Sequence, residues 1–189
     1  MGYSLANTLK NIINADSSTS HFVDEWFNES PYIVAHTSGS TGTPKKIRLL
    51  KSDMIESATA TCRFFKINKK CSLVSPLSAE YIAGKMMIVR SIVSGAKLFI
   101  EQPSNQPLKL DYGEIHLLPL VPSQIDWILS DCKYIKNIRN LIVGGGALSP
   151  AKETELINRG LNAYATYGMT ETCSHIALRR ISSQLYHTL

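Results

Sequence analysis

The 189-residue sequence contains no long apolar run and no segment with the make-up of a secretory leader. A bilayer-spanning helix needs about 20 consecutive apolar residues, and a leader joins a basic start to an apolar stretch. Residues 1–7, Met-Gly-Tyr-Ser-Leu-Ala-Asn, have neither feature. The sequence therefore predicts a cytoplasmic protein without membrane insertion.

Cysteine is scarce, and its spacing excludes the common metal-binding motifs. The four cysteines, Cys62, Cys71, Cys132 and Cys173, form no Cys-x-x-Cys pair. Together with the lack of a leader, this spacing favours reduced thiols in a cytosolic protein.

Clusters of one charge are also missing. Charged residues make up 19% of the chain, and the net charge of +5 comes from scattered lysines and arginines. No basic stripe interleaved with aromatic residues occurs, so we predict no nucleic-acid partner. An anionic small molecule fits the positive balance, and a homo-oligomer is compatible with it.

The hydrophobic pattern predicts an α/β fold. Apolar residues at helical spacing over 4–14 and 20–29 favour an N-terminal helical segment, which we assign to residues 1–31. From about residue 70, strands and helices alternate, which predicts a largely parallel sheet with crossover helices. The expected strands are 72–75, 97–100, 114–118, 140–143 and 162–166, and the expected helices include 52–65, 81–94 and one that opens at 122.

One loop combines the residue types that bind phosphate. The stretch 37–46, Thr-Ser-Gly-Ser-Thr-Gly-Thr-Pro-Lys-Lys, lies between two short apolar strands, 32–35 and 47–50. Glycines bring backbone N–H groups close to an anion, hydroxyls donate to phosphate oxygens, and Lys45 or Lys46 supplies positive charge. Composition alone favours a Ser/Thr/Gly-rich linker, whereas the two flanking strands favour a phosphate-binding loop.

This loop is not a Walker loop. Gly39 and Gly42 are too close together, Pro44 intervenes, and a strand rather than a helix follows.

Two later turns carry further candidate residues. Gly144-Gly145-Gly146-Ala147 follows a strand and would let a planar ring lie on bare backbone, although any sharp turn can use such glycines. Tyr167-Gly168-Met169-Thr170-Glu171-Thr172 offers an aromatic ring for stacking and oxygen ligands for Mg²⁺; the alternative is an exposed loop with a solvated Glu171. The carboxyl ends of parallel strands meet at one rim, so we expect both turns there.

The three stretches together resemble the adenylate-forming superfamily of acyl- and aryl-CoA ligases, luciferases and adenylation domains. The stretch 168–175, Gly-Met-Thr-Glu-Thr-Cys-Ser-His, is most similar to the o-succinylbenzoate–CoA ligases of menaquinone biosynthesis, which commonly end this motif in Gln. The resemblance implies the N-terminal subdomain core of the acyl-CoA synthetase-like fold, an AMP-binding core over 32–189. It also implies ATP-dependent activation of o-succinylbenzoate as the acyl-adenylate, followed by transfer to CoA.

The resemblance further implies residue roles. Lys45, Thr170 and Glu171 would be catalytic, with Thr170 at the α-phosphate and Glu171 on Mg²⁺. Tyr167 would stack on adenine. The remaining nucleotide contacts would be Thr37, Ser38, Gly39, Ser40, Thr41 and Gly42 at the phosphates, and Gly144, Gly145, Gly146, Ala147 and Gly168 around the nucleoside.

Two departures from the family pattern matter. The family usually has Pro-Leu-Phe-His where this chain has Pro76-Leu77-Ser78-Ala79-Glu80-Tyr81, so Tyr81, Lys85 or Arg90 would contact the acyl substrate instead. For Arg90 the alternative is a solvated residue on a helix.

The second departure is the lack of the later Thr-Gly-Asp segment and of the C-terminal lysine domain, so most of the CoA site lies outside this chain. We therefore expect these 189 residues alone to bind ATP weakly and to turn over little. The alternatives are another acyl- or aryl-CoA ligase, an amino-acid adenylation domain, a truncated non-catalytic nucleotide-binding module, or an unrelated α/β domain.

Overall fold

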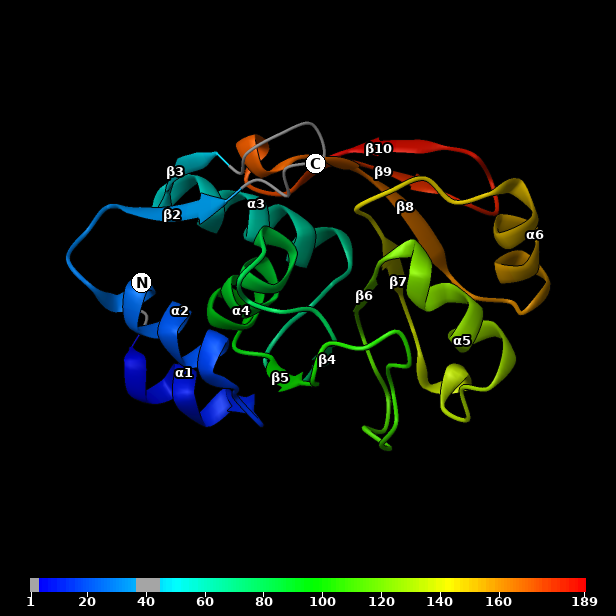
Figure 1. Cartoon of the computed structure of the whole chain (residues 1–189), viewed down its shortest axis with the longest axis horizontal. Coiled ribbons are helices and arrows are strands. Elements are labelled where there is room, and N and C mark those ends of the chain that lie inside the picture. The colour runs from blue at the N-terminus through cyan, green and yellow to red at the C-terminus, as the bar shows by residue number, and fades with distance from the viewer. Residues whose placement is uncertain (1–3, 37–44) are drawn as a thin grey trace.

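The computed structural model describes residues 4–36 and 45–189 (Figure 1). The expected phosphate contacts Thr37, Ser38, Gly39, Ser40, Thr41 and Gly42 lie outside the described residues. The helices are α1 (Leu5–Asn11), α2 (Ser17–Phe27), α3 (Lys51–Phe64), α4 (Ile82–Ser94), α5 (Ile125–Ser130) and α6 (Pro150–Asn158), with 3₁₀ turns η1 (Pro122–Gln124), η2 (Ile135–Asn137) and η3 (Thr170–Thr172). The strands are β1 (Ile12–Ile13), β2 (Tyr32–His36), β3 (Lys46–Leu50), β4 (Ser72–Ser75), β5 (Lys97–Ile100), β6 (Leu118–Leu120), β7 (Leu141–Val143), β8 (Ala163–Gly168), β9 (His175–Arg180) and β10 (Tyr186–Thr188).

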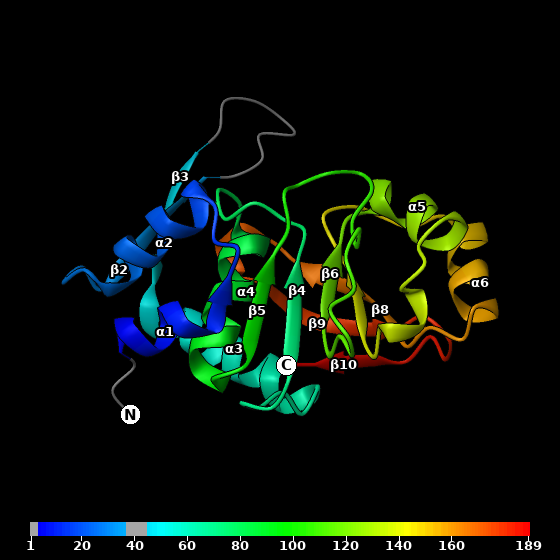
Figure 2. The same ribbon diagram turned by 90° about the horizontal axis from the view of Figure 1, so that it is seen from below.

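The described strands form two larger sheets and one hairpin. One sheet has the order β1-β5-β4 and is parallel; the other has the order β10-β9-β8-β7-β6, in which β6, β7 and β8 are parallel. The segment before β6 joins them, because the His116 N–H donates to the Ser72 carbonyl at 2.8 Å and Leu73 bridges Leu117. Figure 2 shows β5, β4 and β6 side by side. The chain thus has the predicted α/β class.

Helix α4 is the central element of the larger core. Its residues from Gly84 to Ile92 are all buried, and it packs against α3, α2 and the β4–β5 strands. It ends at Gly95, whose φ of 71° is the left-handed C-cap expected of glycine. A second core lies between α5, α6 and the strands β6 to β8, on the right of Figure 1.

The N-terminal segment differs from the expected pair of helices. Ile12 and Ile13 form a strand that pairs in parallel with Leu98 and Phe99 of β5, so the prediction that helix spacing continues to residue 14 is wrong. Helix α2 begins at Ser17, three residues before the expected start at residue 20. Asp16 caps this helix, because its Oδ1 accepts the Thr19 N–H at 2.8 Å.

The later strands also differ in part. Most are confirmed within a residue or two, but over 114–118 the described chain has single bridges at Ile115 and Leu117, and β6 begins only at Leu118. Strand β8 continues through Tyr167 and Gly168, which were expected in a turn. After β8 the chain returns in antiparallel strands β9 and β10, so the sheet is parallel only in its central part.

Candidate functional site

The carboxyl ends of β6, β7 and β8 form the rim where the two C-terminal candidate turns meet. Val143, the last residue of β7, is level with Leu120 on one side and Ala165 on the other. The Gly144 N–H donates to the Leu120 carbonyl at 3.1 Å. The Gly144–Ala147 turn therefore lies between the segments that leave the neighbouring strands, as the sequence predicts.

The glycines of this turn allow close approach. A Cβ on Gly144 would lie 2.4 Å from Thr166 Oγ1, so a side chain there would displace β8 or its threonine. Gly145 has a φ of 77°, which favours glycine. Gly145, Gly146 and Ala147 are exposed, and they present bare backbone beside β8.

The second turn is fixed by its own hydrogen bonds. The Thr172 hydroxyl donates to the Ser174 carbonyl at 2.7 Å and accepts the Met169 N–H at 3.1 Å. A Cβ on Gly168 would lie 2.3 Å from the Ser174 carbonyl oxygen, so only glycine lets the strand end pack on the returning chain. These contacts define the backbone that carries Thr170 and Glu171.

The candidate side chains of this turn face solvent to different degrees. Tyr167 is 65% exposed although its backbone is in β8, so its ring is open for stacking. Thr170 is half-buried and Glu171 is exposed. The arrangement therefore offers an aromatic ring, a hydroxyl and a carboxylate at one strand end.

The β2–β3 hairpin brings a third candidate to this region. Strand β3 contacts η3, although more than 100 residues separate them in sequence. Figure 1 shows η3 beside β3 along the upper edge of the molecule. Lys45 immediately precedes β3 and is exposed. Lys45 and the Thr170–Thr172 turn therefore lie at the same edge of the structure.

A buried polar group lies beneath the second turn. Arg90 of α4 is 2% exposed, and its Nη2 donates to Ser174 Oγ at 2.9 Å. His175 is buried, and its Nε2 lies 3.2 Å from Thr61 Oγ1 of α3. The alternative expectation that Arg90 is a solvated helical residue is wrong, because α4 crosses the core and turns this side chain inward.

Burial changes the protonation of this group. Desolvation lowers the pKa of Arg90 to about 10, so the guanidinium is still charged at neutral pH. Desolvation, reinforced by the nearby Arg90 charge, lowers the pKa of His175 to about 3, so the imidazole is neutral. Among the described residues Arg90 has no ion pair, and its Nε has no hydrogen-bond partner. A buried cation without a counter-ion favours an anionic group nearby.

Sequence reasoning gave Thr61, Ser174 and His175 no role. The only local signal is Thr61, a hydroxyl on the otherwise apolar face of α3 that carries Met54 and Ala58. Its partner lies 114 residues away, so no local pattern identifies the pair.

The two remaining acyl-side candidates differ in environment. Tyr81 is the N-cap residue of α4 and is 57% exposed. Lys85 is 6% exposed; its Nζ lies 3.9 Å from Glu25 Oε2 and 4.7 Å from the centre of the Phe22 ring. In this structure the Lys85 ammonium is paired with a residue of α2.

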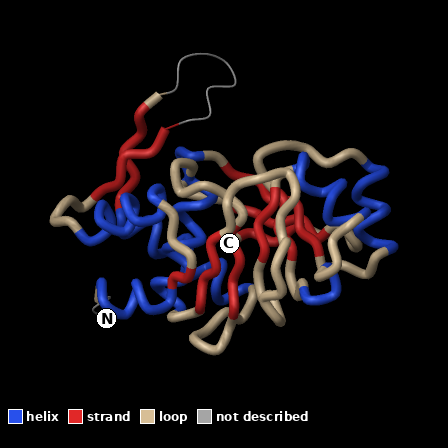
Figure 3. The backbone as a smooth tube through the Cα atoms, turned by 60° about the horizontal axis from the view of Figure 1, so that its bottom comes forward, coloured by secondary structure: helices blue, strands red, loops and turns tan. Residues whose placement is uncertain are grey.

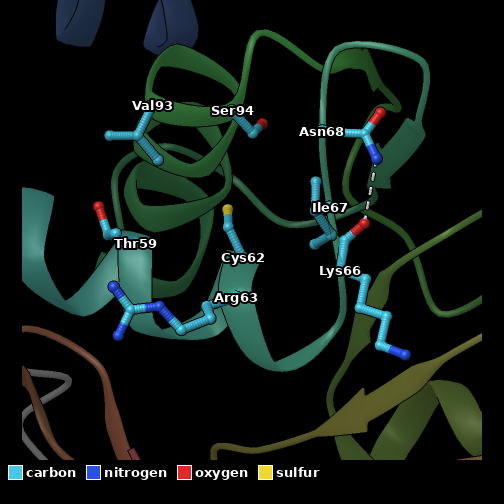
Figure 4. Close-up of a pocket in the computed structure, with 8 residues that line it drawn as sticks. All are labelled: Thr59, Cys62, Arg63, Lys66, Ile67, Asn68, Val93 and Ser94. Atoms are coloured by element: carbon cyan, nitrogen blue, oxygen red, sulfur yellow. Dashed lines mark hydrogen bonds between the residues drawn. The ribbon is translucent and has the colours of Figure 1, made fainter. Parts of the chain in front are cut away.

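Two open cavities of the described chain lie away from the rim. One, of about 450 Å³, is at the C-terminal ends of α3 and α4, where the Asn68 amide donates to the Lys66 carbonyl (Figure 4). The other, of about 580 Å³, is next to Asp111 and Arg139.

The described residues contain no cluster of three or more His, Cys, Asp or Glu side chains suited to a metal. None of the described helices combines the length and apolarity needed to cross a bilayer. A Mg²⁺ ion held by one carboxylate and by nucleotide phosphates needs no such cluster, so the exposed Glu171 fits that ion.

The family match covers nearly the whole chain. The family described as "AMP-binding enzyme" matches residues 5–188. The chain belongs to the AMP-binding enzyme family.

Two curated relatives of this chain are longer proteins. The 2-succinylbenzoate–CoA ligase of Enterococcus faecalis is 28% identical over 156 residues, which are 78% of this chain and 32% of that protein. The ligase of the same name from Listeria monocytogenes serotype 4b is 25% identical over 170 residues, 87% of this chain and 36% of that protein. The chain thus spans about a third of the length of these curated relatives.

Solved structures agree on the fold. The acyl-CoA synthetase (AMP-forming)/AMP-acid ligase II-like protein of Dyadobacter fermentans superposes with a TM-score of 0.84 at 28% identity, covering 100% of this chain and 57% of that one. The o-succinylbenzoate coenzyme A synthetase of Bacillus subtilis, in complex with ATP and a magnesium ion, has a TM-score of 0.72 at 20% identity, covering 95% of this chain and 45% of that one. This AMP-binding chain therefore has the fold of the N-terminal part of an acyl-CoA synthetase.

Proposed function

We propose that this chain is the nucleotide-binding part of an ATP-dependent acid–CoA ligase that activates o-succinylbenzoate as its acyl-adenylate. The observation that carries the proposal is the arrangement of three candidate segments around the end of β8. The glycine turn lies beside Thr166 of β8, and the Thr170–Glu171 turn that follows β8 contacts β3, which Lys45 precedes. The o-succinylbenzoate specificity is supported by the ligases that match at 25–28% identity. Transfer to CoA would require the part of the ligase beyond this chain, including most of its CoA site.

In this proposal each turn binds one part of ATP. Adenine lies on the bare backbone of Gly144–Ala147 with Tyr167 against its face, because glycine backbone and an exposed aromatic ring suit a flat heterocycle. Thr170 donates to the α-phosphate. Lys45, with Gly39, Gly42 and the hydroxyls of Thr37, Ser38, Ser40 and Thr41, would contact the outer phosphates. Gly168 lets the end of β8 pack closely on the returning chain. Glu171 would hold Mg²⁺, which neutralises phosphate charge when bound.

The reaction needs no nucleophilic side chain. One carboxylate oxygen of the acid attacks the α-phosphorus, the bond from that phosphorus to the bridging oxygen breaks, and pyrophosphate leaves. Lys45 and Thr170 orient the phosphates and stabilise the negative charge that develops, so catalysis is positioning and electrostatics.

Arg90 is our candidate for the carboxylate side of the substrate. Its buried charge lacks a counter-ion among the described residues, and it reaches Ser174 at the foot of the Thr170–Glu171 turn. Tyr81, exposed at the start of the same helix, would contact the acyl group.

Binding of non-hydrolysable acyl-adenylate analogues tests the proposal without requiring turnover. Isothermal titration would compare o-succinylbenzoyl, benzoyl and aminoacyl sulfamoyl-adenosines. We expect the o-succinylbenzoyl compound to bind at least about tenfold more tightly than the others, a difference of about 1.4 kcal/mol. Tightest binding of an aminoacyl compound would indicate an adenylation domain instead, and no binding of any of them would overturn the nucleotide site.

A further inference from the structure

The β2–β3 hairpin is a two-stranded sheet of its own. In the described chain it pairs with neither larger sheet, and Figure 3 shows it standing apart from them. Its strands pair with each other from Tyr32–Leu50 to His36–Lys46. Among residues 4–36 and 45–189, no strand pairs with the outer edge of β2, so the N–H groups on that edge need other acceptors.

Glu25 supplies one of these acceptors. Its Oε1 accepts the Val34 N–H of β2 at 3.0 Å, so a side chain of α2 takes the place of a neighbouring strand. Val34 lies between Ile33 and Ala35, both buried. This hydrogen bond thus fixes the middle of β2 to α2.

The second oxygen of the same carboxylate faces Lys85. Glu25 Oε2 lies 3.9 Å from Lys85 Nζ, and the two side chains are 20% and 7% exposed. The ammonium also lies 4.7 Å from the centre of the fully buried Phe22 ring, a cation–π arrangement. Removing Glu25 would leave this cation buried over the ring, with Glu80 the other acid that acts on it.

We propose that Glu25 and Lys85 form a clasp that fixes the β2–β3 hairpin relative to α2 and α4, making both positioning residues for the phosphate end of the nucleotide. The inference rests on the proposed function, because Lys45, the proposed phosphate contact, immediately precedes β3 of the hairpin. Adenine contacts come from other strands, so the clasp acts on the phosphate end alone. It also gives Lys85 a role different from the substrate contact expected from sequence.

The ratio of ATP to AMP affinity tests the clasp. Titration of the 189-residue chain with ATP·Mg²⁺ and with AMP would compare wild type, Glu25→Ala, Glu25→Gln and Lys85→Met. We expect Glu25→Ala to weaken ATP about tenfold and AMP less than about twofold. Glu25→Gln retains an oxygen that can accept the Val34 N–H, so it should lose less ATP affinity than Glu25→Ala. Lys85→Met should lose about as much ATP affinity as Glu25→Gln. Asp24→Asn, an exposed neighbour on α2, is the matched charge control and should leave both affinities unchanged.

Equal losses for ATP and AMP would show general destabilisation and overturn the clasp, as would unchanged affinities. If wild type binds neither nucleotide, the proposed function fails, and amide exchange at Val34 then decides on the clasp itself. The clasp is supported if the Val34 amide is protected from exchange in wild type and Glu25→Gln but not in Glu25→Ala. The same exchange rate in all three overturns it.

Discussion

Gly168 is the residue on which the geometry of the second turn depends most directly. A methyl group there would lie 2.3 Å from the Ser174 carbonyl oxygen and 2.5 Å from His175 Cα, and backbone atoms cannot rotate away. Gly168→Ala should therefore lower the free energy of unfolding by about 1–3 kcal/mol, the usual cost of overpacking. Urea denaturation followed by circular dichroism measures this change.

Gly146→Ala is the matched control for that substitution. Its Cβ would meet the Pro122 ring at 3.4 Å, an ordinary contact. We expect a change within about 0.5 kcal/mol. Equal destabilisation by Gly168→Ala and Gly146→Ala would contradict the prediction that the close packing of Gly168 against Ser174 and His175 excludes a side chain there.

His175 gives the stability of the fold a dependence on pH. Its pKa is about 3 in the folded chain, whereas an unfolded histidine has a pKa of about 6.5. Between these values the unfolded state binds the extra proton, so stability is full above pH 6.5 and falls as the pH is lowered towards 3. From pH 7 to pH 5 this contribution falls by about 2 kcal/mol.

His175→Gln isolates that effect, because glutamine retains hydrogen-bonding groups and does not titrate. We expect the stability difference between wild type and variant to be constant above pH 7 and to shift in favour of the variant below pH 6.5. A difference that stays constant down to pH 5 would contradict a buried neutral imidazole.

At the scale of elements, an ion pair between Arg179 and Glu153 joins β9 to α6. The Arg179 guanidinium contacts both Glu153 oxygens, with Nη1–Oε2 at 3.1 Å, and the two side chains are 18% and 15% exposed. Hydrogen bonds from Arg179 lower the pKa of Glu153. Glu153→Ala should therefore destabilise the fold by about 1–2 kcal/mol at pH 7, as for charge-assisted hydrogen bonds.

Glu155→Ala, on the exposed side of the same helix, should cost less than about 0.5 kcal/mol. Because the Glu153 pKa is lowered by folding, the stabilisation is present above the unfolded pKa of about 4.3 and disappears as the pH falls through the lower folded value. Equal stability of both variants at pH 7 in thermal unfolding would show that this pair does not hold α6.

Elements with strong local signals could be predicted from sequence. Strand β4 has the predicted bounds, 72–75, around the buried Leu73 and Val74. Helix α4 ends at Ser94, as predicted, because Gly95 adopts the left-handed conformation of a C-cap. Strand β1 could not be predicted, because Ile12 and Ile13 continue a helical pattern and become extended only by pairing with β5. The antiparallel return of β9 was missed for the same reason: direction depends on a partner, not on local residues.

At the scale of the whole molecule, part of the candidate site follows from a general rule. Turns after parallel strands share a rim, which predicts that the glycine turn and the end of β8 are close. The approach of β3 to η3, and the Arg90–Ser174–His175 group below it, depend on packing between distant segments. The order of the strands therefore predicted that two members of the site are neighbours. The resemblance to the adenylate-forming superfamily implied that Lys45 belongs with them, and the structure adds the contact between β3 and η3.

We expect the Gly144–Ala147 turn, the Tyr167–Thr172 segment and the start of β3 to bind one nucleotide together. Titration of ¹⁵N-labelled chain with ATP·Mg²⁺, followed by amide chemical shifts, tests it directly. We expect shift changes concentrated at 144–147, 167–172 and 45–46, and no changes at the residues that line the cavity near Lys66. Absence of changes at saturating ATP, or changes confined to the cavities lined by Arg63 or Arg139, would contradict it.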